Sequence, residues 1–157
     1  MAVNIRVAEA SDTEDIIEMW NMFMRFHEEY HHKFVTLKQD AEKIYREKLE
    51  KDLENPDSLY LIVEEDKEVI GYLSASIEEH PEILRQEKLG EISKVFVKKE
   101  KRGQGIGEKL EKKAEEWFKK KSIDLVKARV IEGNEGADKF WKDNSFQDHI
   151  SVKFKEI

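Results

Sequence analysis

The stretch that decides the fold of this chain is residues 89–107, which read LGEISKVFVKKEKRGQGIG. Its first part, Leu89 to Val97, is rich in apolar, β-branched and aromatic residues and predicts a strand. A basic, glycine-containing loop, Lys98 to Gly105, follows the strand. The loop opens a helix whose inward positions are apolar: Ile106, Leu110, Ala114, Trp117 and Phe118.

This loop has the features of a phosphate-binding site. The first turn of a helix has N–H groups without partners and a partial positive charge, and both favour an anion. Glycines let the backbone approach a pyrophosphate without clashes from Cβ atoms. The nearby Lys98, Lys99 and Lys101 add a local positive field. We therefore expect a phosphate group to be bound by Arg102, Gly103, Gln104, Gly105, Ile106, Gly107 and Glu108.

A tight strand-to-helix turn with solvated lysines is the alternative interpretation of this loop. Two other kinds of phosphate loop are excluded. A Walker loop requires a Lys-Ser or Lys-Thr pair, and none follows Gly107. The dinucleotide-binding fingerprint has a different glycine spacing and lies earlier in its domain.

The rest of the chain shows no repeat and no linker, so we expect one domain over residues 1–157. Ser11 and Glu14 have the spacing of a capping box and predict the start of a helix. A strand, a helix and a strand over 89–131 predict a parallel pair with a right-handed crossover. Pro81–Lys88 predicts a loop with a helical turn. The other predicted strands are Val3–Ala8, Leu59–Val63, Val69–Ile77, Ile123–Ile131 and Ile150–Phe154, and the other predicted helices are Thr36–Leu53 and Glu135–Asn144.

Composition excludes several classes of protein. The 157 residues contain no cysteine, which rules out cysteine nucleophiles, thiolate metal sites and disulfides. The net charge of −7 argues against a nucleic-acid partner. No apolar window is long enough for a membrane span, and the first residues lack the pattern of a signal peptide. We therefore expect a cytoplasmic protein with no membrane partner.

The sequence resembles the GNAT superfamily of N-acetyltransferases. The acetyl-CoA loop of that family reads Arg/Gln-x-x-Gly-x-Gly/Ala, which Arg102, Gly105 and Gly107 match. Residues 134–146 resemble a second family motif, with Ala137, Phe140 and Phe146 at the matching positions. The resemblance implies a mixed α/β (α+β) fold, in which a mostly antiparallel sheet has one parallel pair at the cofactor site and about four flanking helices. It also implies acetyl-CoA as co-substrate, with further contacts from Val95, Phe96, Val97, Asn134 and Trp141.

Three positions depart from the family pattern. Trp141 replaces a common Tyr that is often assigned as the acid for the departing thiolate, and an indole N–H cannot act as an acid near neutral pH. Ser145 replaces the usual Gly. Arg129 stands where ribosomal-protein N-terminal acetyltransferases carry a carboxylate, which argues against that subfamily. Trp141 also leaves open a second function, a regulatory module that binds acyl-CoA without turnover.

An amine acceptor must lose a proton before it attacks a thioester, and a carboxylate can remove that proton through a water. Glu91 is the candidate base, because some members of the resembled family use a Glu at this position. A solvent-facing Glu at a strand end is the alternative. The acceptor is a small-molecule or peptide amine, and dimers are common in the family, so the resemblance allows a homodimer. The candidate substrate contacts, which also fit a plain helix core, are Trp20, Phe23, His27 and Tyr30.

Residues 27–31 also read His-Glu-x-x-His. On a helix, His27 and His31 face one way and could bind zinc, with Glu28 as a base and Glu50 as a third ligand. Such strings arise easily in Glu-rich helices with clustered histidines. We therefore expect no metal and keep a zinc hydrolase as a remote alternative.

Overall fold

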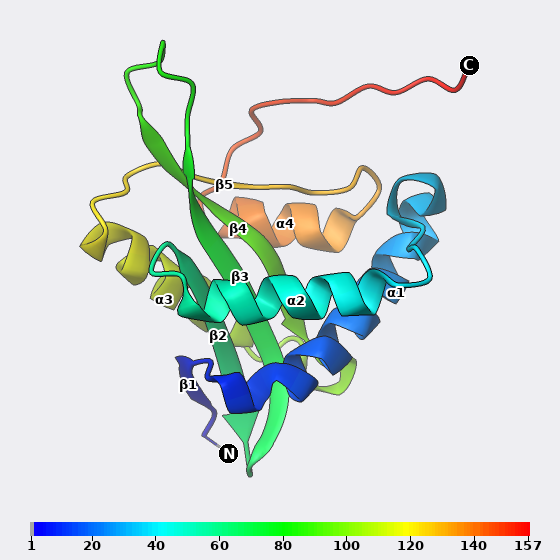
Figure 1. Cartoon of the computed structure of the whole chain (residues 1–157), viewed down its shortest axis with the longest axis vertical. Coiled ribbons are helices and arrows are strands. Elements are labelled where there is room, and N and C mark those ends of the chain that lie inside the picture. The colour runs from blue at the N-terminus through cyan, green and yellow to red at the C-terminus, as the bar shows by residue number, and fades with distance from the viewer. Residues whose placement is uncertain (1) are drawn as a thin grey trace.

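The computed structural model describes residues 2–157, with the side chains of residues 31–34 excepted. Its centre is a five-stranded sheet in the order β1-β2-β3-β4-β5 (Figure 1). The first three neighbouring pairs are antiparallel and the β4–β5 pair is parallel, as the sequence predicts. The strands are β1 (Asn4–Val7), β2 (Ser58–Glu65), β3 (Glu68–Glu79), β4 (Lys88–Val97) and β5 (Val126–Ala128).

Four α-helices cover the two faces of this sheet. The helices α1 (Thr13–Val35) and α2 (Ala41–Glu54) lie on one face, and α3 (Ile106–Lys120) and α4 (Glu135–Asp143) lie on the other (Figure 1). Two short 3-10 helices, η1 (Ala10–Asp12) and η2 (Lys99–Lys101), precede α1 and α3. Among the described residues, no helix combines the length and the apolar content that crossing a membrane requires.

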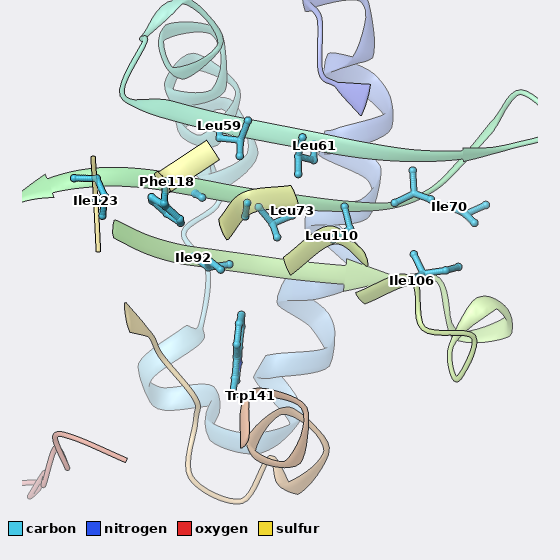
Figure 2. Packing of buried hydrophobic residues seen from close by; sticks show 13 residues of the cluster. Leu59, Leu61, Ile70, Leu73, Ile92, Ile106, Leu110, Phe118, Ile123 and Trp141 are labelled. Carbon is cyan, nitrogen blue, oxygen red and sulfur yellow. The ribbon is translucent and has the colours of Figure 1, made fainter. Parts of the chain in front are cut away.

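Each face of the sheet has its own buried cluster. Alternate side chains of a strand point to opposite faces, so β2, β3 and β4 contribute to both clusters. The cluster under α3 and α4 includes Leu73, Ile92, Leu110 and Phe118 (Figure 2). The cluster under α1 and α2, called here the α1–α2 cluster, consists of Ala8, Ile16, Ile17, Met19, Trp20, Tyr45, Leu49, Tyr60, Ile62, Val69, Tyr72 and Phe96.

A β-bulge in β4 shapes the part of the sheet that matters for function. Ile92 pairs with Ala75 and Lys94 pairs with Ser74, so the intervening Ser93 has no partner on β3. A bulge bends its strand and interrupts the ladder. In the described chain the pairing of β4 with β5 ends at the same point, with Ile92 opposite Ala128. The later part of β4 therefore has a β3 neighbour on one edge and no strand on the other.

Several predicted boundaries were wrong. Ser11 and Glu14 do not form the capping box, because the reciprocal contacts join Glu9 and Asp12 at η1. The second helix begins at Ala41 rather than Thr36, since α1 continues to Val35. The predicted strand Ile123–Ile131 shrinks to β5, and Ile150–Phe154 forms no strand because that segment extends away from the sheet (Figure 1).

A partly buried ion pair ties β1 to the start of α1. Asp12 accepts two hydrogen bonds of 2.9 Å from the guanidinium of Arg6, which also pairs with Glu64 on β2 at 2.6 Å. Asp12 also accepts a hydrogen bond from the backbone N–H of Glu9. The hydrogen bonds from Arg6 lower the pKa of the Asp12 carboxyl, and desolvation opposes them only in part.

We expect Asp12→Asn to lower the free energy of unfolding at pH 7 by about 1.5–3 kcal/mol, the range for hydrogen bonds to charged groups. Because the pKa of Asp12 is lower in the folded state, its contribution is complete above the ordinary pKa of 3.8 and is lost as the pH falls through the folded value. Denaturant titrations across this range should therefore show the two proteins converging at acid pH. The control Glu14→Gln removes the exposed pair with Arg46 and should change stability by less than about 1 kcal/mol. A stability difference that stays constant with pH would contradict this role for Asp12.

Candidate active site

The bulge at Ser93 places Glu91, Lys94 and Phe96 on one face of β4. Their partners on β3 are Ser76, Ser74 and Tyr72, which are alternate residues of a regular strand and so share a face. Tyr72 and Phe96 both belong to the α1–α2 cluster. Glu91 and Lys94 therefore lie on the face that α1 and α2 cover, next to the edge that β5 leaves open.

Glu91 is buried, with 7% of its surface exposed, so it is not a solvent-facing residue at a strand end. The Nζ of Lys127 lies 3.1 Å from its Oε2, and the Nε of Arg129 lies 3.7 Å from its Oε1. Lys127 also pairs with Glu78 at 2.9 Å. The hydrogen bond between Lys127 and Glu78 lowers the pKa of Glu78 and raises that of Lys127. Sequence reasoning missed Lys127 and Glu78, because only the pairing of β3, β4 and β5 brings them beside Glu91.

The segment of β4 after the bulge has both faces occupied and one edge free. Phe96 is buried in the α1–α2 cluster, whereas Val95 and Val97 pack against the cluster under α3 and α4. Their side chains thus anchor the strand, and the backbone on the open edge is the part free to bind a ligand. A role of these three residues in cofactor binding would rest on their backbone groups and stays a prediction.

The glycine-rich loop ends at the N-terminus of α3. Gly105 is the N-cap residue with φ of 76°, a left-handed conformation that glycine adopts without strain, and it offers no side chain to cap the helix. A Cβ atom added at Gly103 or Gly105 would meet no atom within 4 Å, so the backbone is open here. Gly107 is different, because its Cβ would lie 3.0 Å from the ring of Phe140. The glycine at 107 therefore lets α3 pack against α4.

The positive charge near this loop is smaller than the count of lysines suggests. Lys98 pairs with Glu68 at 2.7 Å, and Lys101 pairs with Glu65. Both acids lie in the strands of the β2–β3 hairpin, so these ion pairs hold the loop against it. An anion at the start of α3 would meet mainly backbone N–H groups, with Lys99 and Arg102 nearby.

Arg102 is held in a defined position. Its Nε donates a hydrogen bond of 2.8 Å to the carbonyl oxygen of Val97. Its guanidinium lies 5.6 Å from the ring centres of Phe26 and Phe96, which is within the range of cation–π attraction. Among the other predicted loop contacts, Gln104 is exposed, Ile106 is buried in the core, and Glu108 pairs with Lys112 on the surface of α3.

Asn134, just before α4, and Trp141, on α4, are the remaining predicted cofactor contacts, and both are buried. The side-chain oxygen of Asn134 accepts a hydrogen bond of 3.1 Å from the N–H of Ala137 and caps α4. Trp141 packs edge to face on Phe140 and Phe146. Figure 2 shows its ring projecting from α4 toward Ile92 on β4. Trp141 thus lies against the strand position where β4 and β5 part, and its contact with a cofactor stays a prediction.

We expect Trp141→Ala to lower the free energy of unfolding by about 3–5 kcal/mol, as is usual for truncation of a buried Trp, and to weaken CoA binding. Trp141→Tyr should be tolerated and should raise turnover at low pH, because a phenol can protonate the leaving thiolate. Thermal unfolding and CoA titration on the same variants measure the two effects separately.

Phe118→Ala is the matched control, because Phe118 is a fully buried aromatic residue of the same cluster on α3. It should lose similar stability and keep its CoA affinity. An unchanged CoA affinity in folded Trp141→Ala would assign Trp141 to the core alone.

The four candidate acceptor contacts follow α1 from the core to the surface. Trp20 is 5% exposed and stacks on Tyr45 with ring centres 4.4 Å apart. Phe23 and His27 are half-buried, with ring centres 4.0 Å apart, and the Nδ1 of His27 donates to the carbonyl oxygen of Phe23. Tyr30 is 38% exposed and packs edge to face on Phe26. The structure thus places Trp20 in the core, whereas Tyr30, the last of the four residues along α1, is exposed.

The described side chains give no support to the zinc alternative. In the described part of the chain, no three His, Asp or Glu side chains gather where they could hold a metal ion. The side chain of His31 lies outside the described residues, so the His27–His31 pair itself is not placed.

Comparison with known proteins identifies the family of this chain. Residues 16–146 match the Acetyltransferase (GNAT) family. An uncharacterised N-acetyltransferase of Archaeoglobus fulgidus is 28% identical over 139 residues, which are 88% of this chain and 89% of that protein.

Solved structures share the fold. The aminoglycoside 6'-N-acetyltransferase AAC(6')-Ig of Acinetobacter haemolyticus has a TM-score of 0.77 at 21% identity, over 98% of this chain and 97% of that one. AAC(6')-Iy, in complex with a bisubstrate analogue that contains CoA, has a TM-score of 0.76 at 16% identity, over 100% and 99% of the two chains. The family match spans both the open edge of β4 and the glycine-rich loop. Because it covers most of the sequence, the chain belongs to the GNAT family of acetyltransferases.

Proposed function

We propose that this protein transfers an acetyl group from acetyl-CoA to the primary amine of a small molecule or peptide, with Glu91 as the general base. The observation that carries the proposal is the position of Glu91. It is a buried carboxylate on the face under α1 and α2, beside the point where β4 and β5 part. A base so placed is close to the open strand edge and shielded from bulk water.

The residues present fit acetyl-CoA as the acetyl donor. The pyrophosphate would lie on the backbone from Gly103 to Glu108, where the two open glycines and the uncapped start of α3 offer N–H groups. The pantetheine would lie along the free edge of β4 between Val95 and Val97. Trp141 would supply an apolar wall beside it.

Acetyl-CoA, when bound, supplies a thioester whose carbonyl carbon an amine can attack, with the CoA thiolate as leaving group. Glu91 takes the proton of the ammonium acceptor through one water, which frees the nitrogen lone pair. Lys127 and Arg129 fix the position of the carboxylate. Backbone N–H groups on the free edge of β4 donate hydrogen bonds to the carbonyl oxygen, on which negative charge develops. An ordinary thiol has a pKa of about 8.5, so the thiolate leaves without a strong acid.

An assay of CoA thiol release over a panel of amines tests the proposal. Acetyl transfer to at least one amine, dependent on Glu91, is the expected result. Equilibrium titration with CoA is run in parallel. CoA binding without transfer to any amine would favour the non-catalytic module that Trp141 leaves open, and absence of CoA binding would overturn both.

A further inference from the structure

Several buried hydroxyl groups lie on the sheet face under α1 and α2. The hydroxyl groups of Tyr45, Tyr72 and Ser74 are all buried. Those of Tyr45 and Tyr72 interact with each other, and Tyr45 also interacts with Tyr60, whose hydroxyl donates a hydrogen bond of 3.0 Å to Asp52. The Ser74 hydroxyl has no hydrogen-bond partner among the described residues. Tyr72 and Ser74 lie on one face of β3, and Tyr45 covers them from α2. Buried polar groups of folded proteins nearly always have a partner, so such a group requires an explanation. Here Ser74 lies two residues along β3 from Ser76, the partner of the candidate base Glu91, and the Oε2 of Glu91 has no hydrogen-bond partner among the described residues besides its ion pair with Lys127.

Lys94 is a cation of this face without an ion-pair partner among the described carboxylates. It pairs with Ser74 across the β3–β4 ladder, and its Nζ lies 5.5 Å from the ring centre of Tyr45. Two neighbouring lysines do have ion-pair partners: Lys48 pairs with Asp52, and Lys127 pairs with Glu78 and Glu91. Within the described part of the chain, no carboxylate lies within 4 Å of the Lys94 ammonium group.

The environment of Lys94 is unfavourable for a free cation. Burial lowers the pKa of Lys94, and the charge of Lys48 lowers it further, while Glu91 and Asp52 only partly compensate. A partly buried ammonium group without a counterion gains more from an anionic ligand than an exposed lysine does. The feature is therefore more typical of a binding site than of a structural contact.

We infer that Lys94 binds a carboxylate of the acceptor, so that the acceptor is an amino acid or a related amine that also carries a carboxylate. This inference rests on the proposed function and names the class of its substrate. Glu91 and Lys94 lie on the same face of β4, and their β3 partners Ser76 and Ser74 are two residues apart, about 7 Å along a strand. The amine of such an acceptor would lie toward Glu91 and its carboxylate toward Lys94, and the unpaired Ser74 hydroxyl would add a hydrogen bond.

The same arrangement disfavours polycationic amines. A polyamine or an aminoglycoside would bring additional positive charges toward Lys94, where like charges repel in a partly desolvated site. The chain shares its fold with aminoglycoside acetyltransferases at 16–21% identity, but the charge on this face points to a different acceptor.

The test compares acceptors that differ only in the carboxylate: tyrosine with tyramine, histidine with histamine, and lysine with cadaverine. We expect the wild-type protein to prefer the amino acid of each pair. Lys94→Met should raise the KM of the amino acid about 10–100-fold, the loss expected for one hydrogen-bonded charge pair, and should leave the decarboxylated amine unchanged. Lys94→Arg should retain the preference. Lys88→Met, an exposed lysine of the same strand, is the matched control and should change nothing.

A binding measurement gives a readout apart from activity. Titration of the preferred amino acid into the CoA-saturated protein should show a Kd that rises in Lys94→Met by the same factor as the KM. Lys94→Gln serves if Lys94→Met does not fold.

The inference is overturned if the wild-type protein prefers the decarboxylated amines. It is also overturned if Lys94→Met slows both members of a pair equally, or if no amino acid binds to the CoA-saturated protein. Failure of the proposed function would look different, because CoA binding or all acetyl transfer would then be absent in the wild-type protein.

Discussion

Replacing Glu91 with Gln is expected to lower the rate of acetyl transfer about 10²–10⁴-fold, the usual range for removal of a general base, while the affinity for CoA stays the same. Glutamine keeps the size and the hydrogen-bonding capacity of the side chain but cannot accept the proton. The loss should shrink as the pH rises, because an increasing fraction of the acceptor amine is then already deprotonated. Steady-state kinetics between neutral and alkaline pH, with CoA titration alongside, measure both effects.

Glu78→Gln is the matched control for this prediction. Glu78 is the other carboxylate that pairs with Lys127, but it lies nearer the exposed end of β3. Its loss weakens a partly exposed ion pair and should change the rate by no more than about fivefold. A rate loss in Glu91→Gln that does not vary with pH, or no loss at all, would assign Glu91 a structural role.

Replacing Gly105 with Val is expected to raise the Kd for acetyl-CoA at least about 100-fold, which corresponds to the loss of two hydrogen bonds to a charged group. The valine side chain would project into the open space above the loop, where the phosphates are proposed to lie. The φ of 76° at this position is also strained for a β-branched residue and adds a cost in stability of about 1–2 kcal/mol. Calorimetric titration with CoA and thermal unfolding separate the two effects.

Ser122→Val introduces the same kind of strain at the other end of α3, since Ser122 has a φ of 59°. This control adds only the β-branch, because Ser122 already has a Cβ atom, so it should lose less stability than Gly105→Val and should keep its CoA affinity. A folded Gly105→Val protein that binds CoA as well as the wild type would exclude this loop from the phosphate site.

The elements that carry the proposed coenzyme site could be predicted from the sequence because their signal is local. A strand, three alternating glycines and an apolar-striped helix follow one another over 89–107, and the structure has them in that order. The mixed sheet with its parallel β4–β5 pair was also predicted correctly. The predicted last strand, Ile150–Phe154, was wrong, because alternation shows that a segment could pair and does not supply a partner strand.

The shared face of Glu91 and Lys94, the proposed acceptor side of the site, could not be predicted because it depends on the bulge at Ser93. Regular alternation along β4 would place Glu91, Ser93 and Val95 on one face and Lys94 on the other. One extra residue moves Lys94 to the face of Glu91, and no residue type in the sequence marks that shift. The ion pairs of Lys98 and Lys101 with acids of the β2–β3 hairpin could not be predicted either, since they join segments about 30 residues apart in the sequence.

The free edge of β4 has a consequence for how such enzymes diverge. Backbone N–H groups along that edge and at the start of α3 are present whatever side chains stand there, so selection on coenzyme use acts chiefly on a few glycines. The acceptor, in contrast, is proposed to meet side chains on the face under α1 and α2, among them Lys94, which pairs with Ser74 across the β3–β4 ladder. Mutations at these two positions can alter the preferred amine without disturbing the donor site. Descendants of one ancestral gene can thus keep the same donor while acquiring new acceptors, one substitution at a time.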